Sequence, residues 1–214
     1  MMKLYGYFRS SAAYRVRIAL ELKKLDWESI PVNLLHAEQQ SEAFRDINPQ
    51  GLVPALEYDG QVISQSLAIM EWLDETFPSV SLLPSDPLVK AQVRALAYQI
   101  AIEVHPLNNL RVLKYLQSEL NVEESQKLQW YQHWVEQGFG AFERSLLQYG
   151  SNGQFCIGDR PTLADICLIP QVYNAKRFNC DLSPYPMILS VSNHCSSLAP
   201  FIIAAPESQA DCPN

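Results

Sequence analysis

The chain has 214 residues, 48% of them hydrophobic, which is enough for one large core or two smaller ones. The formal net charge of −7 and the lack of a basic tract exclude a general nucleic-acid binder. The N-terminus lacks the apolar core of a signal peptide, and no apolar run is long enough to span a membrane. We therefore expect a cytoplasmic protein that binds neither nucleic acid nor membrane.

All five cysteines follow residue 155, at positions Cys156, Cys167, Cys180, Cys195 and Cys212. Their spacing contains no CxxC pair and suits neither a zinc site nor a disulfide framework, so we expect buried free thiols and no metal. Because the first 155 residues contain no cysteine, thiol chemistry in that part requires a thiol brought in by a ligand.

The first predicted elements are a strand at residues 3–8 and an amphipathic helix over residues 12–22. Ser10 and Ser11 stand at their junction. Serine is a preferred N-cap, so capping is the simpler interpretation of these hydroxyls. The positive end of a helix dipole also suits an anion or a thiolate.

Basic residues crowd into the same stretch. Residues 1–24 contain six lysines and arginines against Glu21 alone, an excess of five positive charges. Such an excess suits an anionic small ligand, although a solvated helix face is the ordinary explanation.

Residues 27–32 predict a second strand, which completes a βαβ unit. A short helix is expected at residues 41–47, before the break Asn48-Pro49-Gln50-Gly51. An Asp-Gly pair at residues 59–60 between apolar runs predicts a hairpin. Pro54, at the start of its first strand, needs an edge or a special turn.

A further helix is predicted from Leu67 to about Phe77, after Ser64-Gln65-Ser66. The amides and hydroxyls at its start could bind a carboxylate, although capping is again the simpler account. A proline-rich linker follows. We expect a domain at residues 1–80, the linker at residues 81–86 and an all-helical domain at residues 87–214.

The helical domain is predicted to contain long helices at residues 88–105, 108–120 and 123–149. Pro106 should break or kink the first of them and expose His105, Asn108, Asn109 and Arg111 near the break. A lone histidine is more often structural than catalytic. Thr162 and Asp165 resemble a capping box, so Asp165 is interpreted as structural. Short helices are expected within residues 184–204 and a frayed end at residues 206–214.

These segments together resemble the zeta class of the cytosolic glutathione transferases over nearly the whole chain. The matching motifs, in order, are Ser10-Ser11-Ala12-Ala13-Tyr14-Arg15-Val16-Arg17-Ile18-Ala19-Leu20, Asn48-Pro49 with Val53-Pro54, Gln65-Ser66-Leu67-Ala68-Ile69, Gly158-Asp159 with Thr162-Leu163-Ala164-Asp165, Pro170-Gln171-Val172 and Arg177-Phe178. The chain departs from the family signature in Ala12, which replaces a cysteine, and in Tyr14, which replaces a tryptophan.

The resemblance implies an α/β plus all-α fold, with a thioredoxin-like N-terminal domain and a helical C-terminal domain. It also implies a homodimer, a cis Val53–Pro54 bond and glutathione as the cofactor. Ser10 is the best match to the hydroxyl that holds the glutathione sulfur, with Ser11 next to it. The backbone of Val53 would bind the cysteinyl part.

For the rest of glutathione, the resemblance implies Gln65 and Ser66 at the γ-glutamyl end and Gln40 at the glycyl end. His105 and Asn109 match polar residues near the family's active-site cleft. The substrate's carboxylates are assigned to arginines, because a guanidinium pairs with a carboxylate bidentately. These are Arg9, Arg111 and Arg177.

The implied activity is glutathione-dependent cis–trans isomerisation of maleylacetoacetate to fumarylacetoacetate, a step of tyrosine and phenylalanine breakdown. We interpret the missing cysteine at Ala12 as auxiliary, because the nucleophile is glutathione itself. The alternatives are maleylpyruvate isomerisation in gentisate breakdown and conjugation or dehalogenation of α-halo acids. A non-catalytic glutathione-binding protein is a further alternative, against which the retained Ser10, Gln65 and Ser66 speak.

Overall fold

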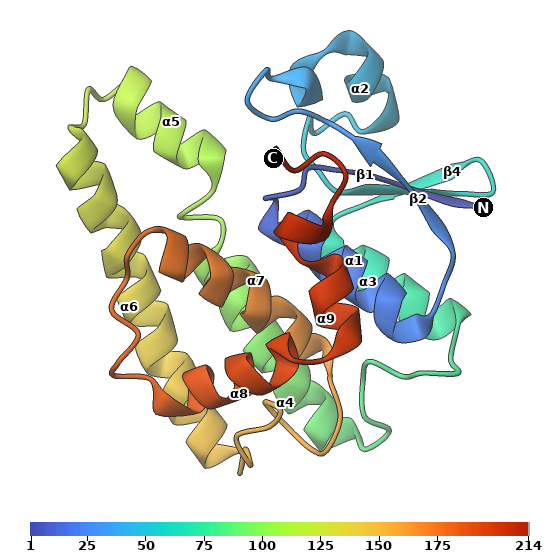
Figure 1. Ribbon diagram of the computed structural model, residues 1–214, viewed down its shortest axis with the longest axis vertical. Coiled ribbons are helices and arrows are strands. Elements are labelled where there is room, and N and C mark those ends of the chain that lie inside the picture. Colours follow the sequence, from blue (N-terminus) through green and yellow to red (C-terminus); the bar gives the residue numbers. More distant parts are fainter. Residues whose placement is uncertain (214) are drawn as a thin grey trace. The chain divides into compact units, whose positions relative to one another are not determined.

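The computed structural model describes residues 1–213, and packing divides the chain into two compact units (Figure 1). The first unit contains residues 1–82 and the chain from Ser197 onward, and the second contains residues 83–196. The sequence predicts residues 87–214 as one helical domain, whereas the segment from Ser197 packs with the first unit.

The first unit is an α/β unit, as predicted. Its elements are β1 (Met2–Gly6), α1 (Ser11–Lys23), β2 (Trp27–Pro31), α2 (Glu42–Ile47), β3 (Ala55–Tyr58), β4 (Gln61–Ser64), α3 (Ser66–Thr76) and α9 (Ala199–Ala204), with short 3-10 helices at Glu38–Gln40 and Pro206–Ser208. The sheet has the order β2-β1-β3-β4. Strand β1 runs parallel to β2 and antiparallel to β3, and β3 runs antiparallel to β4. The predicted βαβ unit and hairpin are therefore both present.

Helices cover both faces of this sheet (Figure 1). Side chains alternate between the faces along a strand. Tyr5 packs against Phe44 of α2, with ring centroids 6.3 Å apart, so Leu4 points to the opposite face, where α1 and α3 lie side by side. Leu4 and Leu56 are almost completely buried.

The three cations of α1 are buried, so the expectation that its positive charge forms a solvated helix face is wrong for this helix. Arg15, Arg17 and Lys23 are only 2–4% exposed. They are buried because α3 covers one side of α1 and α9 covers another. Burial lowers the pKa of Arg17 to about 10, while the charges of Tyr14 and Asp211 oppose the shift.

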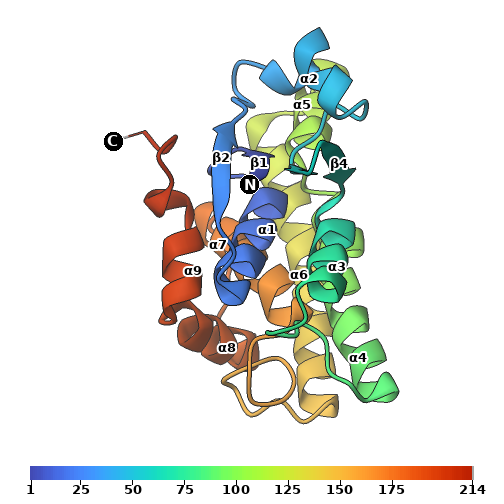
Figure 2. The ribbon, with the colours of Figure 1, turned by 90° about the vertical axis from the view of Figure 1, so that its right-hand side faces the viewer.

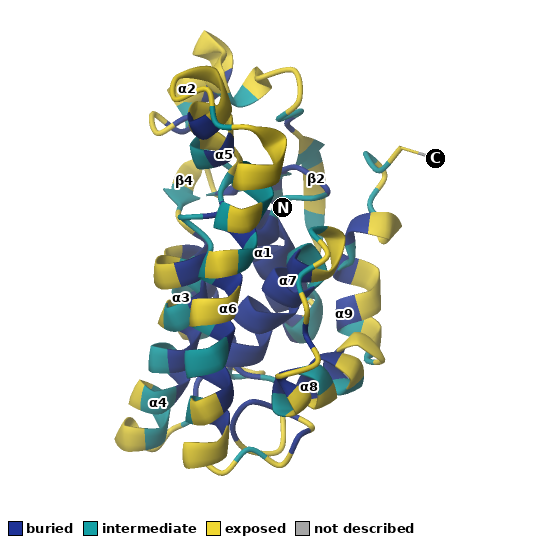
Figure 3. Ribbon diagram, turned by 90° about the vertical axis from the view of Figure 1, so that its left-hand side faces the viewer, coloured by how far each residue is buried: buried dark blue, intermediate teal, exposed yellow. Residues whose placement is uncertain are grey.

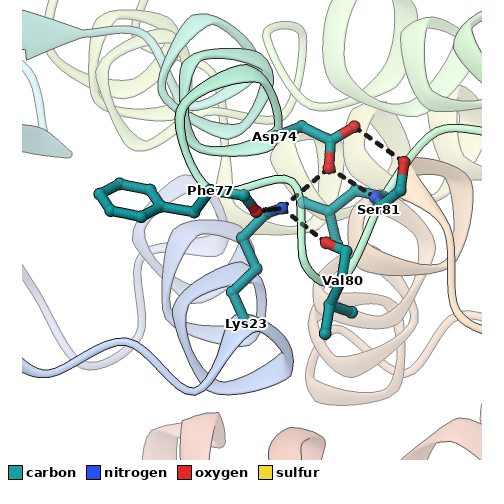
Figure 4. Close-up of polar contacts among 6 residues, drawn as sticks. Lys23, Asp74, Phe77, Val80 and Ser81 are labelled. Carbon is teal, nitrogen blue, oxygen red and sulfur yellow. Dashed lines mark hydrogen bonds and ion pairs between the residues drawn. The ribbon is translucent and has the colours of Figure 1, made fainter.

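Lys23 shows how such a charge is accommodated (Figure 4). Its ammonium donates to Asp74 Oδ1 at 2.8 Å and to the carbonyls of Phe77 and Val80 at 3.0 and 2.6 Å. The same Asp74 oxygen accepts from the amide of Leu82 at 2.7 Å. This cluster fastens the end of α1 to the chain that follows α3.

Helix α9 lies against α1 (Figure 2). The Tyr14 hydroxyl donates to the carbonyl of Phe201 at 3.3 Å, and Arg17 Nε donates to that of Ala204 at 2.9 Å. The expectation of a frayed end is wrong for residues 206–213, because Asp211 accepts a 2.9 Å hydrogen bond from the amide of Phe8. Residue 214 lies outside the described residues.

The second unit is helical. Its elements are α4 (Pro87–Tyr98), a π-helix (Gln99–Val104), α5 (Leu110–Ser118), α6 (Glu124–Gln148), α7 (Leu163–Arg177) and α8 (Pro186–Ser196). Helix α7 is buried along most of its length (Figure 3) and packs against α4 and α8. The predicted capping box is confirmed, because Asp165 Oδ2 accepts from the amide of Thr162 at 2.8 Å.

The helix break predicted at Pro106 is also confirmed, since regular helix ends at Val104. The expected exposure of Asn108 is wrong, because Asn108 is only 7% exposed and donates to the carbonyl of Tyr131. The last turn before the break is a π-helix, a form of helix that often occurs at functional sites. Gly138 of α6 lies so close that a Cβ added there would come within 2.1 Å of Val104 Cγ2. Residue size at position 138 therefore controls how α6 packs against this turn.

Candidate active site

Three segments with predicted site residues meet at one end of the sheet. Tyr5 of β1 pairs with Ala55 of β3, and Ala55 pairs with Ser64 of β4. The last residues of β1 and β4 therefore lie beside the first residue of β3. The turn before α1, the segment before β3 and the start of α3 all belong to this end.

Of the two serines predicted at the start of α1, Ser10 is the N-cap. Its Oγ accepts a 3.2 Å hydrogen bond from the amide of Ala13, and its own amide donates to the carbonyl of Tyr7 at 2.9 Å. A hydroxyl that accepts a bond still has its proton to donate. Ser10 is half-buried, whereas Ser11 is only 4% exposed. Capping and donation to a ligand are therefore compatible at Ser10, and Ser10 is the more accessible of the two hydroxyls.

The two departures from the family signature lie just behind this cap. Ala12 is half-buried in the first turn of α1 and offers only a methyl group. Tyr14 is buried, and its hydroxyl donates to α9. Neither side chain supplies a nucleophile, and residues 1–155 contain no cysteine.

The segment before β3 offers a backbone to an extended ligand. The Val53–Pro54 bond is cis, as the resemblance implied. Val53 lies outside the ladder of β3, and within residues 1–213 no turn or loop hydrogen bond uses its amide or its carbonyl. A strand-like ligand could therefore pair with both groups, as in β-augmentation.

The start of α3 combines unusual backbone geometry with a buried cation. Gln65 has φ +70° and ψ 115° and is exposed. Non-glycine residues in such conformations concentrate at functional sites. The next residue, Ser66, accepts a 3.3 Å hydrogen bond from Arg15 Nη1. A helix N-terminus with a guanidinium behind it favours a carboxylate.

Gln40 joins the same region through the loop that leads to Val53. Gln40 Nε2 donates to the carbonyl of Gly51 at 3.1 Å, and Gln65 Nε2 donates to Gln50 Oε1 at 2.7 Å. The structure thus gathers Gln40, Val53 and Gln65 around one short loop.

Arg9 is the half-buried cation nearest in sequence to Ser10. Its guanidinium carbon lies 5.0 Å from the ring centroid of Phe8, and Nη2 donates weakly to the Tyr7 hydroxyl at 3.4 Å. No carboxylate bond to Arg9 occurs within residues 1–213, so the charge remains available to an anion.

The remaining predicted residues belong to the helical unit. His105 follows the π-helix, and Asn109 caps α5 by accepting from the amide of Arg111 at 3.1 Å. Arg111 is exposed. Arg177 ends α7, is exposed and donates to Asn174 Oδ1 at 3.0 Å.

Within the helical unit, Tyr131 of α6 contacts both the segment after Pro106 and the end of α7. Its carbonyl accepts from Asn108 Nδ2 at 3.2 Å, and its ring stacks on Phe178 at 3.8 Å. Burial raises the pKa of the Tyr131 phenol, so it stays neutral. The segment after Pro106 and the end of α7 with Arg177 therefore lie at one end of this unit.

Sequence reasoning missed Arg15 as a site residue. The helical pattern of α1 places Arg15 among the polar positions, which predicts an exposed side chain. In the structure α3 packs against α1, and Arg15 bonds to Ser66 at the start of α3. Its place between the apolar residues Tyr14 and Val16 was the one available signal.

Across residues 1–213, no group of three His, Cys, Asp or Glu side chains is placed to hold a metal ion. The five cysteines are free; three of them are buried, whereas Cys180 and Cys212 are only half-buried. In the same part of the chain, no helix combines the length and the apolar character needed to cross a membrane.

The mixed sheet, with a capped helix and an accessible backbone at one end, defines a thioredoxin-like protein suited to hold a small thiol peptide. Residues 9–76 match the family model for the glutathione S-transferase N-terminal domain. A probable maleylacetoacetate isomerase of Vibrio cholerae is 47% identical over 211 residues, which covers 97% of each chain. The chain belongs to the zeta class of the glutathione S-transferase family.

Two solved structures illustrate the same fold. The holo structure of a zeta-class maleyl pyruvate isomerase is 44% identical with a TM-score of 0.96, and the match covers 99% of this chain and 100% of that one. A maleylacetoacetate isomerase from Anaeromyxobacter dehalogenans is 40% identical with a TM-score of 0.89, over 100% and 98% of the two chains. That enzyme holds dicarboxyethyl glutathione and citrate in its active site.

Proposed function

We propose that this protein catalyses the glutathione-dependent cis–trans isomerisation of maleylacetoacetate to fumarylacetoacetate. The observation that carries the proposal is the meeting of Ser10, the unused backbone of Val53 and the start of α3 at one end of the sheet. Family membership and the named relatives support it.

The residues at this end of the sheet fit glutathione. Val53 would pair with the cysteinyl backbone, because its amide and carbonyl lie outside the strand ladder. Gln65 and Ser66 would hold the γ-glutamyl end, where Arg15 adds positive charge behind the helix terminus. We assign the glycyl end to Gln40, which lies across the loop.

Glutathione, when bound, supplies the thiolate that adds to the double bond. Addition leaves a single bond, about which the substrate can rotate, and elimination of the thiolate restores the double bond in the trans form. A free thiol has a pKa of about 8.5 and is mostly protonated at neutral pH. Ser10 is the residue we assign to stabilise the charged form, because its hydroxyl can donate while its oxygen keeps the cap. The N-terminal amides of α1 act in the same direction.

Negative charge moves onto the conjugated carbonyl of the substrate during addition, and cations stabilise it. We assign the binding of the substrate's carboxylates to Arg9 and, from the helical unit, to Arg111 and Arg177. The Anaeromyxobacter enzyme supports a carboxylate-binding role for this family, because it holds a glutathione derivative with two added carboxylates. His105 and Asn109 are assigned to the surroundings of the bound ligands.

Maleylpyruvate is the second candidate substrate. The structure of a maleyl pyruvate isomerase matches this chain with a TM-score of 0.96, and Arg111 supplies a cation in the segment after Pro106. The two substrates share the maleyl group, so the same thiolate chemistry serves either one.

We also propose that the protein is a homodimer in the cytoplasm. Tyr58, Trp72 and Phe77 form a mutually packed aromatic cluster on the first unit, and the Tyr58 side chain is exposed. Such an apolar surface suits an interface. Free cysteines suit a reducing compartment. Sedimentation at two protein concentrations measures the oligomeric state, and a monomer throughout would contradict the dimer.

The activity test measures glutathione-dependent loss of ultraviolet absorbance with maleylacetoacetate and with maleylpyruvate, each coupled to the matching fumaryl hydrolase. Faster turnover of maleylacetoacetate supports the first proposal, and faster turnover of maleylpyruvate supports the second. Turnover of neither substrate, with glutathione still bound, would refute both.

The role of Ser10 is tested by comparing Ser10→Ala with Ser11→Ala. We expect Ser10→Ala to lower turnover about 100-fold, in the range for losing one donor to a developing anion, and Ser11→Ala to lower it much less. Equal losses would contradict the assignment of the thiolate donor to Ser10.

A further inference from the structure

The turn that carries Ser10 is held by two polar side chains, that of Asp211, which is remote in sequence, and that of Arg17 in α1. On one side, the amide of Phe8 donates to Asp211 Oδ2 at 2.9 Å. On the other side, Arg17 Nη2 donates to the carbonyl of Phe8 at 2.9 Å, and Nη1 reaches the carbonyl of Tyr7 at 3.5 Å. Both backbone polar groups of Phe8 are therefore bound.

Asp211 belongs to a folded segment, residues 205–213, which we name the C-terminal strap. Gln209 Nε2 donates to the carbonyls of Ile203 and Ala205 at 2.9 and 3.0 Å, at the end of α9. Ser208 Oγ donates to the carbonyl of Ile202 at 2.7 Å. The strap is thus fastened to α9, and Asp211 has a defined position.

Helix α9 in turn is fastened to α1, because Arg17 Nε donates to the carbonyl of Ala204 at 2.9 Å. The same guanidinium therefore bonds to α9 and to the turn before α1. Arg17 is only 3% exposed, so water cannot readily replace its partners. Arg17 and the strap form one connected support for the turn.

This support acts two residues away from Ser10. Phe8 is 5% exposed, and removal of its acceptor would leave a buried amide without a partner, which favours a shift of the turn. The Ser10 amide bonds to the carbonyl of Tyr7 within the same turn, so such a shift moves Ser10. A misplacement of about 1 Å in a reacting group can lower a rate about 100-fold.

We propose that Asp211 and Arg17 are positioning residues for the thiolate site, and that the C-terminal strap holds the Phe8–Ser10 turn in the geometry in which the Ser10 hydroxyl reaches the glutathione sulfur. This inference rests on the proposed function. It adds a structural role for a segment in which the sequence shows no functional motif.

The test compares Asp211→Ala, which removes the acceptor, with Asp211→Asn, which keeps an acceptor oxygen but removes the charge. The measurements are the pKa of the bound glutathione thiol from thiolate absorbance, the Kd for glutathione, and kcat for isomerisation. Ser10→Ala serves as the benchmark. Asp26→Ala, an exposed carboxylate of the same unit, is the matched control.

We expect Asp211→Ala to raise the thiol pKa by about one unit, which lowers the thiolate fraction about tenfold at pH values well below the thiol pKa, with a similar fall in kcat at those pH values. The Kd for glutathione should change less than about twofold, because other residues hold the peptide. Asp211→Asn and Asp26→Ala should behave as the unaltered protein. Arg17→Lys keeps the positive charge but loses the guanidinium group, which bonds to several carbonyls at once, so this variant should resemble Asp211→Ala.

Two results would overturn the inference. A lower thiol pKa in both Asp211 variants would show that the carboxylate acts only through its charge. An unchanged thiol pKa in Asp211→Ala, with Ser10→Ala raising it, would show that the strap has only a structural role. If Ser10→Ala itself leaves the thiol pKa unchanged, the assignment of Ser10 in the proposed function fails instead.

Discussion

Replacing Lys23 with methionine should destabilise the first unit strongly. Methionine has a similar length but removes a fully buried ammonium and three donors, to Asp74 Oδ1 and to the carbonyls of Phe77 and Val80. Removing one partner of a buried ion pair costs about 3–5 kcal/mol. Asp74 keeps its bond from the amide of Leu82, so we expect about 3 kcal/mol, from the lower end of this range.

The assay is urea unfolding of the full chain followed by tryptophan fluorescence. Lys24→Met is the matched control, because Lys24 is the adjacent lysine and is exposed, and it should lose less than about 0.5 kcal/mol. In a double-mutant cycle with Asp74→Asn, the combined loss should be smaller than the sum of the single losses. A loss below about 1 kcal/mol for Lys23→Met, or an equal loss for the control, would refute the reasoning.

Three further predictions concern other parts of the chain. Arg177→Ala should raise KM for a maleyl dicarboxylate and leave glutathione affinity unchanged, and loss of glutathione binding in a titration would contradict this role. Gly138→Ala should lower the thermal midpoint, because the new Cβ would lie 2.1 Å from Val104 Cγ2, whereas Gly140→Ala, with no neighbour within 4 Å of the added Cβ, should not. Bonds from Lys3 and Tyr5 lower the pKa of Glu57, so its contribution to stability is present above the unfolded pKa and is lost as pH falls through the folded pKa. The Glu57→Gln variant should therefore show a weaker loss of stability in acid, and an unchanged acid profile would argue against the contribution.

Local sequence signals predicted local structure well. The Ser10 cap, the hairpin at Asp59-Gly60 and the Thr162–Asp165 capping box each depend on a few adjacent residues, and all are present. The hairpin also sets the register that brings the start of α3 beside the start of β3. The position of Gln65 near the loop before Val53 can therefore be predicted from the sequence if the strand order is assumed.

Contacts between segments distant in sequence could not be predicted from local sequence patterns. The bond from Arg17 to α9 joins residues 187 positions apart, and that from Phe8 to Asp211 joins residues 203 apart. Periodicity places Arg17 on a polar face of α1 but says nothing of what covers that face. For this reason the predictions of a solvated helix face for α1 and of a frayed chain end were both wrong.

The buried arginines of α1 change how the basic run near Ser10 should be interpreted. Arg17 is committed to backbone carbonyls of the first unit, and Arg15 lies behind Ser66 with only 2% of its surface exposed. A buried guanidinium with such partners stabilises the fold and the helix terminus, but it cannot reach a substrate carboxylate in solution. We therefore predict that the charge that discriminates one maleyl substrate from another comes from the predicted site arginines that remain accessible, Arg9, Arg111 and Arg177.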